Sequence, residues 1–501
     1  MSQNGFVKKI SDYCTGEGLL PGVSCIVTGL SGGPDSVALM CVLAAMKQMS
    51  DSFPKLIAVH VNHGLRESAA DDEKLSKDLC ERLQVEFKSY RFDIREQAKK
   101  LGRGLEETGR IVRYQAFREA AQNAAQSMGV DVSTVRIATA HHKGDLTETF
   151  LMNLFRGAGL EGLTAMSSDT MLIRPLICVS KEEILSYLKE ENIPFAVDET
   201  NLHNDFTRNK WRNEIIPLIS EVSVKDPQEA VLDTYRLLSS DEDFISSEAV
   251  SAYNRCIVRK GKYAFLDASG VSSLHPAVRS RVIRLYWKEL FGNLTDFESK
   301  HVDIVTGLLA GNNGTKYADL PFGRKALSVD GLLAFYGDEG PQGVSCAMSS
   351  YLGFPAALMG DKVHIRKSDL ISGPQTLKMS DFAVSIEVSV VENNDSIVYN
   401  NLSWIGAYDD IVIGACPSGG TFRKAGSAHA VEIKKIMSDN RVPRDAREHL
   451  LAVSSDDRIL FIPGIGHAEG FVSQKSRQIW NKEKGNSDIK TLIKVEISEK
   501  E

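Results

Sequence analysis

Six consecutive residues near the N-terminus combine the groups that bind a phosphate. They read SGGPDS and comprise Ser31, Gly32, Gly33, Pro34, Asp35 and Ser36. Glycines let backbone N–H groups point at one anion, and serine hydroxyls add further donors. A Walker-type loop would end in Gly-Lys-Ser/Thr with its lysine on the phosphates, whereas this segment carries an acid there. Because a carboxylate faces a phosphate only across a cation, the segment predicts a phosphate site that uses Mg²⁺.

The simpler interpretation of this segment is an ordinary strand-to-helix turn, in which Asp35 stabilises the first helical turn through the helix dipole. The flanking residues agree with such a turn, because an apolar run precedes it and residues 37–46 repeat with helical spacing. Pro34 suits the start of that helix. The concentration of hydroxyls, glycines and an acid in one short loop nevertheless favours the phosphate site.

A second group of reactive side chains lies in the stretch TAHHKGDLTETF. His141, His142 and Asp145 follow an apolar strand pattern and precede a helix that carries Glu148. Imidazole and carboxylate are zinc ligands, but no third protein ligand stands nearby. The histidines could also be satisfied within an ordinary loop. The remaining interpretation is that Asp145 and a histidine face the phosphate site, where Asp145 would share Mg²⁺ with Asp35.

The elements that must position these groups alternate between strand and helix. Strand patterns and helix patterns follow each other over the first 218 residues, which predicts an α/β domain built on a doubly wound parallel sheet. In such a sheet the site lies at the carboxyl ends of the strands, so the loop at 30–36 and the segments ending at 63 and 142 should line one crevice. We predict strands within 55–65, 85–92 and 135–142, and helices within 67–85, 104–125 and 145–155.

Beyond this domain the pattern changes twice. Residues 225–310 have mainly helical spacing, and alternating segments with turn residues follow after the stretch GNNGTKYADLPFGRKALSVDGLLAFYG. We therefore predict a catalytic domain at 1–218, a mainly helical middle domain at 219–340, a hairpin-rich connecting segment at 341–399 and a small mixed α/β domain at 400–501.

Composition limits the possible classes of protein. The 501 residues contain no continuous apolar run long enough to span a bilayer and no apolar N-terminal signal segment. Eight scattered cysteines without a C-x-x-C pair favour reduced thiols and a cytoplasmic location over a disulfide or zinc framework. The net charge is −7, but residues 421–501 hold 15 basic and 12 acidic residues, so the basic excess lies at the C-terminal end.

The SGGPDS loop resembles the SGGxDS signature of the PP-loop ATP pyrophosphatases, which cleave ATP between the α- and β-phosphates. Further motifs resemble, in the same order, those of the tRNA(Ile)-lysidine synthase family. The resemblance covers nearly all of residues 20–218, is weak at 220–400 and returns in GTFRKAGSAHAVEIKKIMSDNRVPRDAREHLL. The N-terminal motifs are VNHGLRESAADDE, EETGRIVRYQAF, AHHKGDLTETFLMNLFRGAGLEGL, IRPLICVSKEEI and VDETNLHNDFTRNKWRNEIIPLI.

This resemblance implies an ATP-dependent ligase that acts on the tRNA(Ile) whose anticodon is CAU. ATP would adenylate C2 of the wobble cytidine with release of pyrophosphate, and free lysine would then displace AMP to give lysidine. Codon reading would change from AUG to AUA. ATP and Mg²⁺ are the implied cofactors, with no membrane partner, and the sequence does not indicate the oligomeric state.

The implied roles fall on particular residues. Asp35 and Asp145 would hold the metal, and Asp145 or His141 could take a proton from lysine. Arginine forks suit the phosphates of ATP or RNA, and exposed basic residues suit the tRNA backbone, although either set could be a solvated surface. The predicted substrate-binding residues are Arg110, Arg113, Arg208, Asn209, Arg212, Lys434, Lys435, Arg444 and Arg447.

Some features depart from the family pattern, and others argue against alternative functions. Gly144 stands where many relatives have a first acid, and Leu450 replaces an expected Trp-Pro or similar pair. A thiolating PP-loop enzyme would normally need cysteine pairs, and a tRNA-binding protein with an inactive ATP site would not need an intact SGGPDS. The G-x-G-x-x-G match at 157–162 follows a helix pattern rather than a strand, and KMSD at 378–381 has no partner motif, so we interpret both as coincidental.

Overall fold

The computed structural model forms two compact units, residues 1–244 and 245–501. Within the motifs named above, residues 63–68, 197–205, 380–381 and 425 lie outside the described part of the chain. Among the described residues no helix is long and apolar enough to cross a membrane. The structure describes residues 3–62, 69–166, 171–196, 206–310, 314–356, 362–366, 368–369, 373–379, 384–392, 403–405, 410–424, 426–455, 458–468 and 491–499.

The first unit contains a five-stranded sheet in the order β3-β2-β1-β4-β5, and all its strands are parallel. The chain order reverses at β1, so the crevice between β1 and β4 is the topological switch point of the sheet. Ligands bind outside the carboxyl ends of strands at such a point, and there the loop after β1 faces the loop after β4. The strands are β1 (Cys25–Gly29), β2 (Lys55–Asn62), β3 (Glu86–Arg91), β4 (Val135–Ala138) and β5 (Leu172–Ile173).

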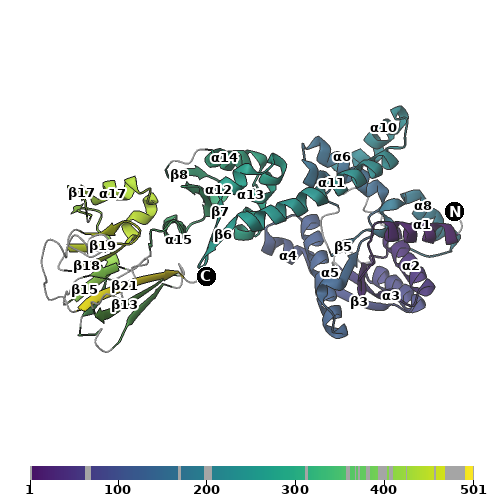
Figure 1. Ribbon diagram of the computed structural model, residues 1–501. Coiled ribbons are helices and arrows are strands. Elements are labelled where there is room, and N and C mark those ends of the chain that lie inside the picture. The colour runs from purple at the N-terminus through teal and green to yellow at the C-terminus, as the bar shows by residue number, and fades with distance from the viewer. Residues whose placement is uncertain are drawn as a thin grey trace. The chain divides into compact units, whose positions relative to one another are not determined.

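Helices cover both faces of this sheet, as its apolar strands require (Figure 1). One face packs against α1 (Gln3–Gly16), α2 (Pro34–Met49), α3 (Ala69–Leu83) and α8 (Lys181–Glu190). The other packs against α5 (Leu105–Met128), whose alanines allow close approach to the strands. The remaining elements are α4 (Ile94–Leu101), η1 (Val132–Thr134), α6 (Lys143–Phe155), α7 (Leu160–Leu163), η2 (Pro175–Cys178), α9 (Phe206–Lys210), the π-helical η4 (Trp211–Ile215) and α10 (Ile216–Val222).

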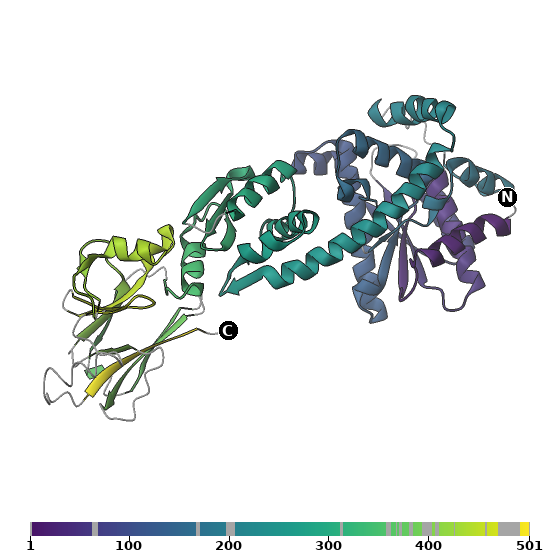
Figure 2. The same ribbon diagram turned by 45° about the horizontal axis from the view of Figure 1, so that its top comes forward.

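The long helix α11 (Pro227–Cys256) begins in the first unit and ends in the second (Figure 2). Near its N-terminal end, Val231, Leu232 and Tyr235 pack against Leu146 and Phe150 of α6. Residues closer to its C-terminal end contribute to the apolar core of the second unit. One continuous helix therefore belongs to the cores of both units.

The second unit begins with helices that pack on an antiparallel sheet. The sheet has the order β6-β7-β10-β9-β8 and encloses a core around Trp287, Phe297 and Phe335. The helices of this middle region agree with the helical spacing predicted from the sequence, but none of the five strands of this sheet was predicted. Its elements are β6 (Ile257–Lys260), β7 (Tyr263–Asp267), α12 (Ala268–Ser273), α13 (Pro276–Phe291), α14 (Ser299–Leu309), β8 (Lys316–Asp319), η5 (Pro321–Gly323), β9 (Lys325–Val329) and β10 (Leu332–Tyr336).

The remainder of the second unit is a mixed α/β segment. Its sheets have the orders β11-β15-β18-β19-β20, β12-β13-β21-β14 and β16-β17. The helix α15 (Gln342–Tyr351) is buried in the same apolar cluster as β10 and these sheets, so one core joins them. The other elements are β11 (Val363–Arg366), β12 (Gln375–Met379), β13 (Val384–Glu392), β14 (Ser403–Ile405), β15 (Asp410–Ala415), β16 (Thr421–Phe422), β17 (Val431–Glu432), α17 (Ile433–Asp439), η7 (Arg444–His449), β18 (Leu451–Ser455), β19 (Arg458–Ile462), β20 (Gly466–His467) and β21 (Thr491–Glu499).

The fold class predicted from the sequence is confirmed: a doubly wound parallel sheet, a helical middle region and a mixed α/β C-terminal region. Every strand and helix predicted within the first 155 residues is also present. The exact domain boundaries at 218, 340 and 399 stay predictions.

Candidate active site

The loop after β1 turns sharply onto the start of α2. Gly32 has φ +87°, a conformation that L-residues rarely adopt, and Gly33 is the N-cap residue of α2. The Ser36 hydroxyl accepts the Ser31 N–H at 3.1 Å and donates to the Gly33 carbonyl oxygen at 2.9 Å. Pro34 occupies the first turn, where its missing N–H costs nothing. The predicted cradle of glycines and hydroxyls is therefore present at a helix N-terminus.

Neighbouring segments hold this loop in place. The buried His60 ring places Nδ1 2.9 Å from the Leu30 carbonyl oxygen. The Gly32 carbonyl oxygen accepts the Ala196 N–H at 2.9 Å. The loop is thus fixed from β2 on one side and from residues 193–196 on the other.

Asp35 points from the first turn of α2 toward a cation that sequence analysis missed. Lys181, the first residue of α8, places Nζ 2.5 Å from Asp35 Oδ1. The two side chains are 35% and 32% exposed, so the pair is accessible to solvent. Nothing in the sequence pattern separates Lys181 from other lysines that begin a helix.

The loop after β4 places Asp145 in the first turn of α6. His142 is the N-cap residue: its Nδ1 accepts the Gly144 N–H at 3.0 Å, and its own N–H donates to Asp145 Oδ2 at 3.1 Å. Desolvation would raise the pKa of Asp145, but His142, His141, the His142 N–H and Arg208 outweigh it and hold the pKa below its usual value. Asp145 is therefore ionised at neutral pH.

Glu148, one turn further along α6, is almost fully buried and binds two arginines. Arg208 Nε lies 2.7 Å from its Oε2, and Arg212 Nε lies 2.5 Å from its Oε1. Both guanidinium groups also reach Asp145 Oδ1, at 3.4 and 3.3 Å. The i, i+3 spacing of the acids and the i, i+4 spacing of the arginines place each pair on one helix face. Sequence analysis placed Glu148 on this helix but gave it no role, although that spacing marks it.

The predicted catalytic histidine lies beside this cluster. His141 Nδ1 is 2.9 Å from the Thr139 hydroxyl. Burial lowers the pKa of His141 to about 4, and the charges of Arg174, Arg110 and Arg208 add to this although Asp145 opposes them. The ring is thus neutral at neutral pH and is held by Thr139 within a loop beside the charged cluster, so its catalytic role stays a prediction.

Of the other predicted residues of this unit, Arg110 lies near enough to His141 to influence its pKa. Arg110 is exposed on α5 and stacks over the Tyr114 ring at 5.5 Å, and Arg113 lies one turn further on. Asn209 is half-buried between the two arginines that bind Glu148. Arg208 and Arg212 contact carboxylates here, so their binding of phosphates stays a prediction.

The two predicted magnesium ligands, Asp35 and Asp145, differ in their exposure and in the contacts of their carboxylate oxygens. Asp35 is one third exposed at the end of the loop, and Mg²⁺ is typically held by one or two carboxylates together with substrate phosphates and water. Both oxygens of Asp145 already have partners. The donor set therefore fits Mg²⁺ at Asp35, whereas Asp145 would have to exchange its arginine contacts to join. No group of three or more potential metal ligands occurs among the described residues.

The basic residues predicted to bind RNA at the C-terminal end belong to the second unit. Lys434 and Lys435 are exposed on α17, and Arg444 is exposed at the start of η7. Arg447 instead donates from Nε to the Val442 carbonyl oxygen at 3.1 Å and is half-buried. Three of the four side chains are thus positioned as a solvated basic surface, and the fourth stabilises its own segment.

Comparison with known proteins gives two matching families. The PP-loop domain family matches residues 6–219, and the family described as the TilS substrate C-terminal domain matches residues 411–483. Among solved structures, the U34-tRNA thiolase NcsA from Methanococcus maripaludis has a TM-score of 0.38 and 19% identity over 47% of this chain and 78% of that one, which supports no inference.

Curated relatives match over nearly the whole chain. The tRNA(Ile)-lysidine synthase of Caldanaerobacter subterraneus subsp. tengcongensis is 30% identical over 90% of this chain and 91% of its own length. That of Clostridium tetani is 28% identical over 90% and 92%. With its phosphate loop at the switch point of a parallel sheet and this similarity along its length, the chain belongs to the tRNA(Ile)-lysidine synthase family.

Proposed function

We propose that the protein ligates free lysine to C2 of the wobble cytidine in the CAU anticodon of tRNA(Ile). The observation that carries this proposal is the similarity to proteins named tRNA(Ile)-lysidine synthase over 90% of the chain. The phosphate loop and the charged crevice beside it supply a site at which ATP could be used.

The proposed reaction has two steps. The C2 carbonyl oxygen attacks the α-phosphate of ATP, the bond between the α- and β-phosphates breaks, and pyrophosphate leaves. The side-chain amine of lysine then attacks C2, the bond between C2 and the oxygen of AMP breaks, and AMP leaves with that oxygen. The product would be lysidine, which reads AUA in place of AUG.

The loop residues would act mainly on pyrophosphate. Backbone N–H groups and hydroxyls within Ser31–Ser36 are oriented by the helix N-terminus and would stabilise the charge that develops on the leaving group. Asp35 would hold Mg²⁺, which neutralises phosphate charge when bound. The same carboxylate would lose its contact with Lys181 as the metal binds.

The second step needs a proton acceptor, because lysine attacks only as the neutral amine. Asp145 and His141 are both unprotonated at neutral pH, so each could accept that proton. Their lowered pKa values make both weak bases, and a role in orienting the amine agrees better with the many contacts of Asp145.

We further propose a division of labour along the chain. The first domain would perform the chemistry and contact the anticodon, with Arg110 and Arg113 at the edge of the crevice. The exposed lysines and Arg444 of the C-terminal domain would bind phosphates of the tRNA body, as basic surface residues do.

The deciding experiment is mass spectrometry of tRNA(Ile) after incubation with protein, ATP and isotopically labelled lysine. The expected result is a single nucleoside, at the wobble position, that carries the label. A sulfur-sized mass change would indicate a thiolase instead. Binding of tRNA without any exchange of pyrophosphate into ATP would indicate a tRNA-binding protein with an inactive ATP site. The Asp35→Ala variant serves as the matched negative control.

A further inference from the structure

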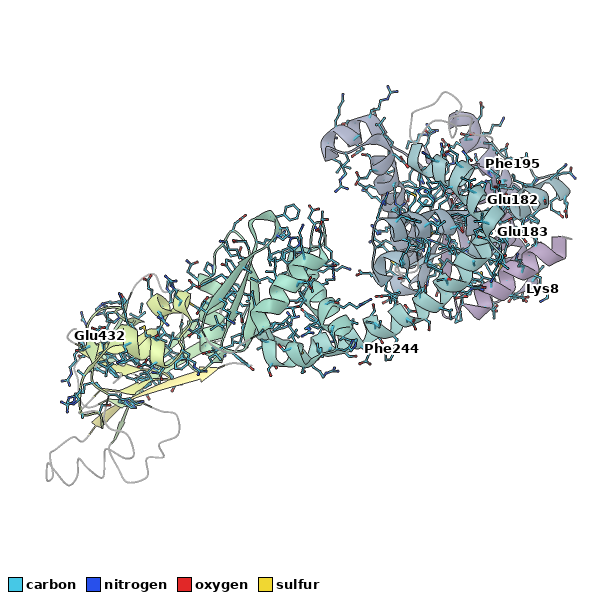
Figure 3. The ribbon with its side chains drawn as sticks, turned by 90° about the horizontal axis from the view of Figure 1, so that it is seen from above. Lys8, Glu182, Glu183, Phe195, Phe244 and Glu432 are labelled. Atoms are coloured by element: carbon cyan, nitrogen blue, oxygen red, sulfur yellow. The ribbon has the colours of Figure 1, made fainter. Side chains whose placement is uncertain are left out.

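Lys181 is a cation aimed at the phosphate loop from a helix that sequence analysis did not associate with it. It is the first residue of α8, directly after the Ser180 N-cap, and its Nζ lies 2.5 Å from Asp35 Oδ1. Figure 3 marks the next two residues of the same helix, Glu182 and Glu183. The contact joins residues 146 positions apart, so no local sequence preference explains it.

The stability of α8 does not explain this lysine. A cation in the first turn of a helix opposes the helix dipole, whereas Glu182 and Glu183 complement it. Glu183 completes a capping box with Ser180, which satisfies the helix start without Lys181. The helix docks on α2 through the buried side chains Ile184, Tyr187 and Leu188, so the ion pair adds little to that packing. A partly exposed ion pair contributes little stability in any case.

The chemistry of the phosphate loop explains why a lysine stands at position 181. A Walker loop carries its own lysine for the β- and γ-phosphates, and this loop has Asp35 in that region. Two cations of the crevice, Arg208 and Arg212, already bind Glu148 and Asp145. Among the described residues Lys181 pairs with Asp35, a carboxylate that is itself suited to Mg²⁺. About a third of the Lys181 side chain is exposed, so its ammonium can move.

We propose that Lys181 is the pyrophosphate-binding cation of this site, supplied by α8 in place of the lysine that a Walker loop carries. The proposal rests on the proposed use of ATP. Lys181 neutralises Asp35 in the present structure. When Asp35 takes Mg²⁺, the ammonium loses its carboxylate partner and pairs instead with oxygens of the β- and γ-phosphates. The lysine would thus bind the leaving group and make no contact with AMP.

The test is equilibrium binding of inorganic pyrophosphate, in the presence of Mg²⁺, measured by calorimetry on the full chain. Lys181→Met should weaken pyrophosphate binding on the order of 10- to 100-fold, the loss expected for one charge-assisted hydrogen bond. Lys181→Arg should restore most of the affinity because it keeps the charge. Binding of AMP should be the same in all variants within about two-fold, since no contact to the α-phosphate is removed.

Lys9 offers a matched control. It pairs with Glu183 on the same helix, Nζ to Oε1 2.7 Å, and the two side chains are 32% and 27% exposed. Lys9 lies on α1, next to the Lys8 marked in Figure 3. Lys9→Met therefore removes an equivalent ion pair of α8 on the side of α1, and it should leave pyrophosphate binding unchanged.

Equal pyrophosphate affinity for Lys181→Met, Lys9→Met and wild-type protein would overturn the proposal and leave the contact with Asp35 as a surface ion pair. An equal loss in Lys181→Met and Lys181→Arg would also overturn it, because charge would then not be the cause. If Lys181→Met does not fold, Lys181→Gln takes its place. A loss specific to Lys181 without any lysidine formed by wild-type protein would support the phosphate role and contradict only the proposed function.

Discussion

The crevice of the first unit and the basic surface of the second use charge in opposite ways. In the crevice, Asp145 and Glu148 meet Arg208 and Arg212 from another helix, and each group has several charged partners. On the C-terminal surface, Lys434 and Lys435 are exposed on one short helix. Clustered, partly buried charges are stable only when paired, whereas exposed charges are screened and act singly. The first arrangement can hold a reacting group in one geometry, and the second can only add affinity.

The largest expected effect comes from the end of the phosphate loop. Asp35→Ala removes the carboxylate that we expect to hold Mg²⁺, so pyrophosphate release should fall at least about 1,000-fold. The fold should persist, because the side chain is partly exposed and its ion pair with Lys181 lies in solvent reach. Release of pyrophosphate from ATP and tRNA, with circular dichroism as the check on folding, measures both. Near-normal release by a folded variant would remove Asp35 from the chemistry.

The second prediction separates the two acids of α6. Asp145→Asn keeps an oxygen that can accept the His142 N–H, so activity should fall about 100-fold or more with little change in stability. Glu148→Gln should in addition destabilise the first unit by about 2 kcal/mol, since it leaves two guanidinium groups facing a neutral, buried partner. Urea unfolding and pyrophosphate release on the same preparations test this. If Asp145→Asn changes only the stability, the residue is structural.

In both regions, the features that neighbouring residues encode could be predicted from the sequence. The loop, the parallel sheet and the pairing of Asp145 with the β4 end follow from local patterns, because glycines, apolar runs and strand ends are encoded by neighbouring residues. The exposed lysines of α17 were also visible as a charge pattern.

Contacts between distant segments could not be predicted. Lys181 meets Asp35 across 146 positions, and Lys143 is buried against Glu229 of α11. Such contacts depend on how helices dock, and no periodicity within either helix specifies the partner. The two arginines illustrate the same limit, since their type and spacing fit phosphates and carboxylates equally well, and only the fold brings them to Glu148.

The third prediction concerns the basic surface and should give a smaller, additive effect. Each phosphate contact that is lost should lower the salt dependence of tRNA binding by roughly one unit of slope. Neutralising Lys434, Lys435 and Arg444 together should raise the Michaelis constant for tRNA and flatten that dependence, while the constant for ATP stays the same. Binding measured across a salt series decides it.

Arg447 provides the contrast within that surface. Its Nε donates to the Val442 carbonyl oxygen, so Arg447→Ala should lower stability by about 1 kcal/mol and change the salt dependence less than the exposed residues do. An unchanged slope after the triple substitution would mean that the three side chains are only a solvated surface. A slope that depends mainly on Arg447 would reverse our assignment.

The smallest effect compares two half-buried histidines, one in each region. Burial lowers the pKa of both His141 and His467 to about 4, with further contributions from Arg174 in the first case and Lys424 in the second. The unfolded chain binds the proton near its ordinary pKa of 6.5, so the unfolded state is favoured as the pH falls from about 6.5 toward 4. Each histidine should thus cost about 1–2 kcal/mol of stability at about pH 5 and nothing above about pH 7.5.

Replacing either histidine by glutamine should remove part of this pH dependence, and urea unfolding at the two pH values measures it. The two variants should differ in chemistry. His141→Gln should also slow lysidine formation, because the ring lies beside Asp145 in the crevice, whereas His467→Gln should leave pyrophosphate release unchanged. If both variants keep the wild-type slope, burial does not hold these rings neutral. If His141→Gln also forms lysidine at the wild-type rate, His141 affects stability alone. The charges around His141 are then what distinguishes the two regions.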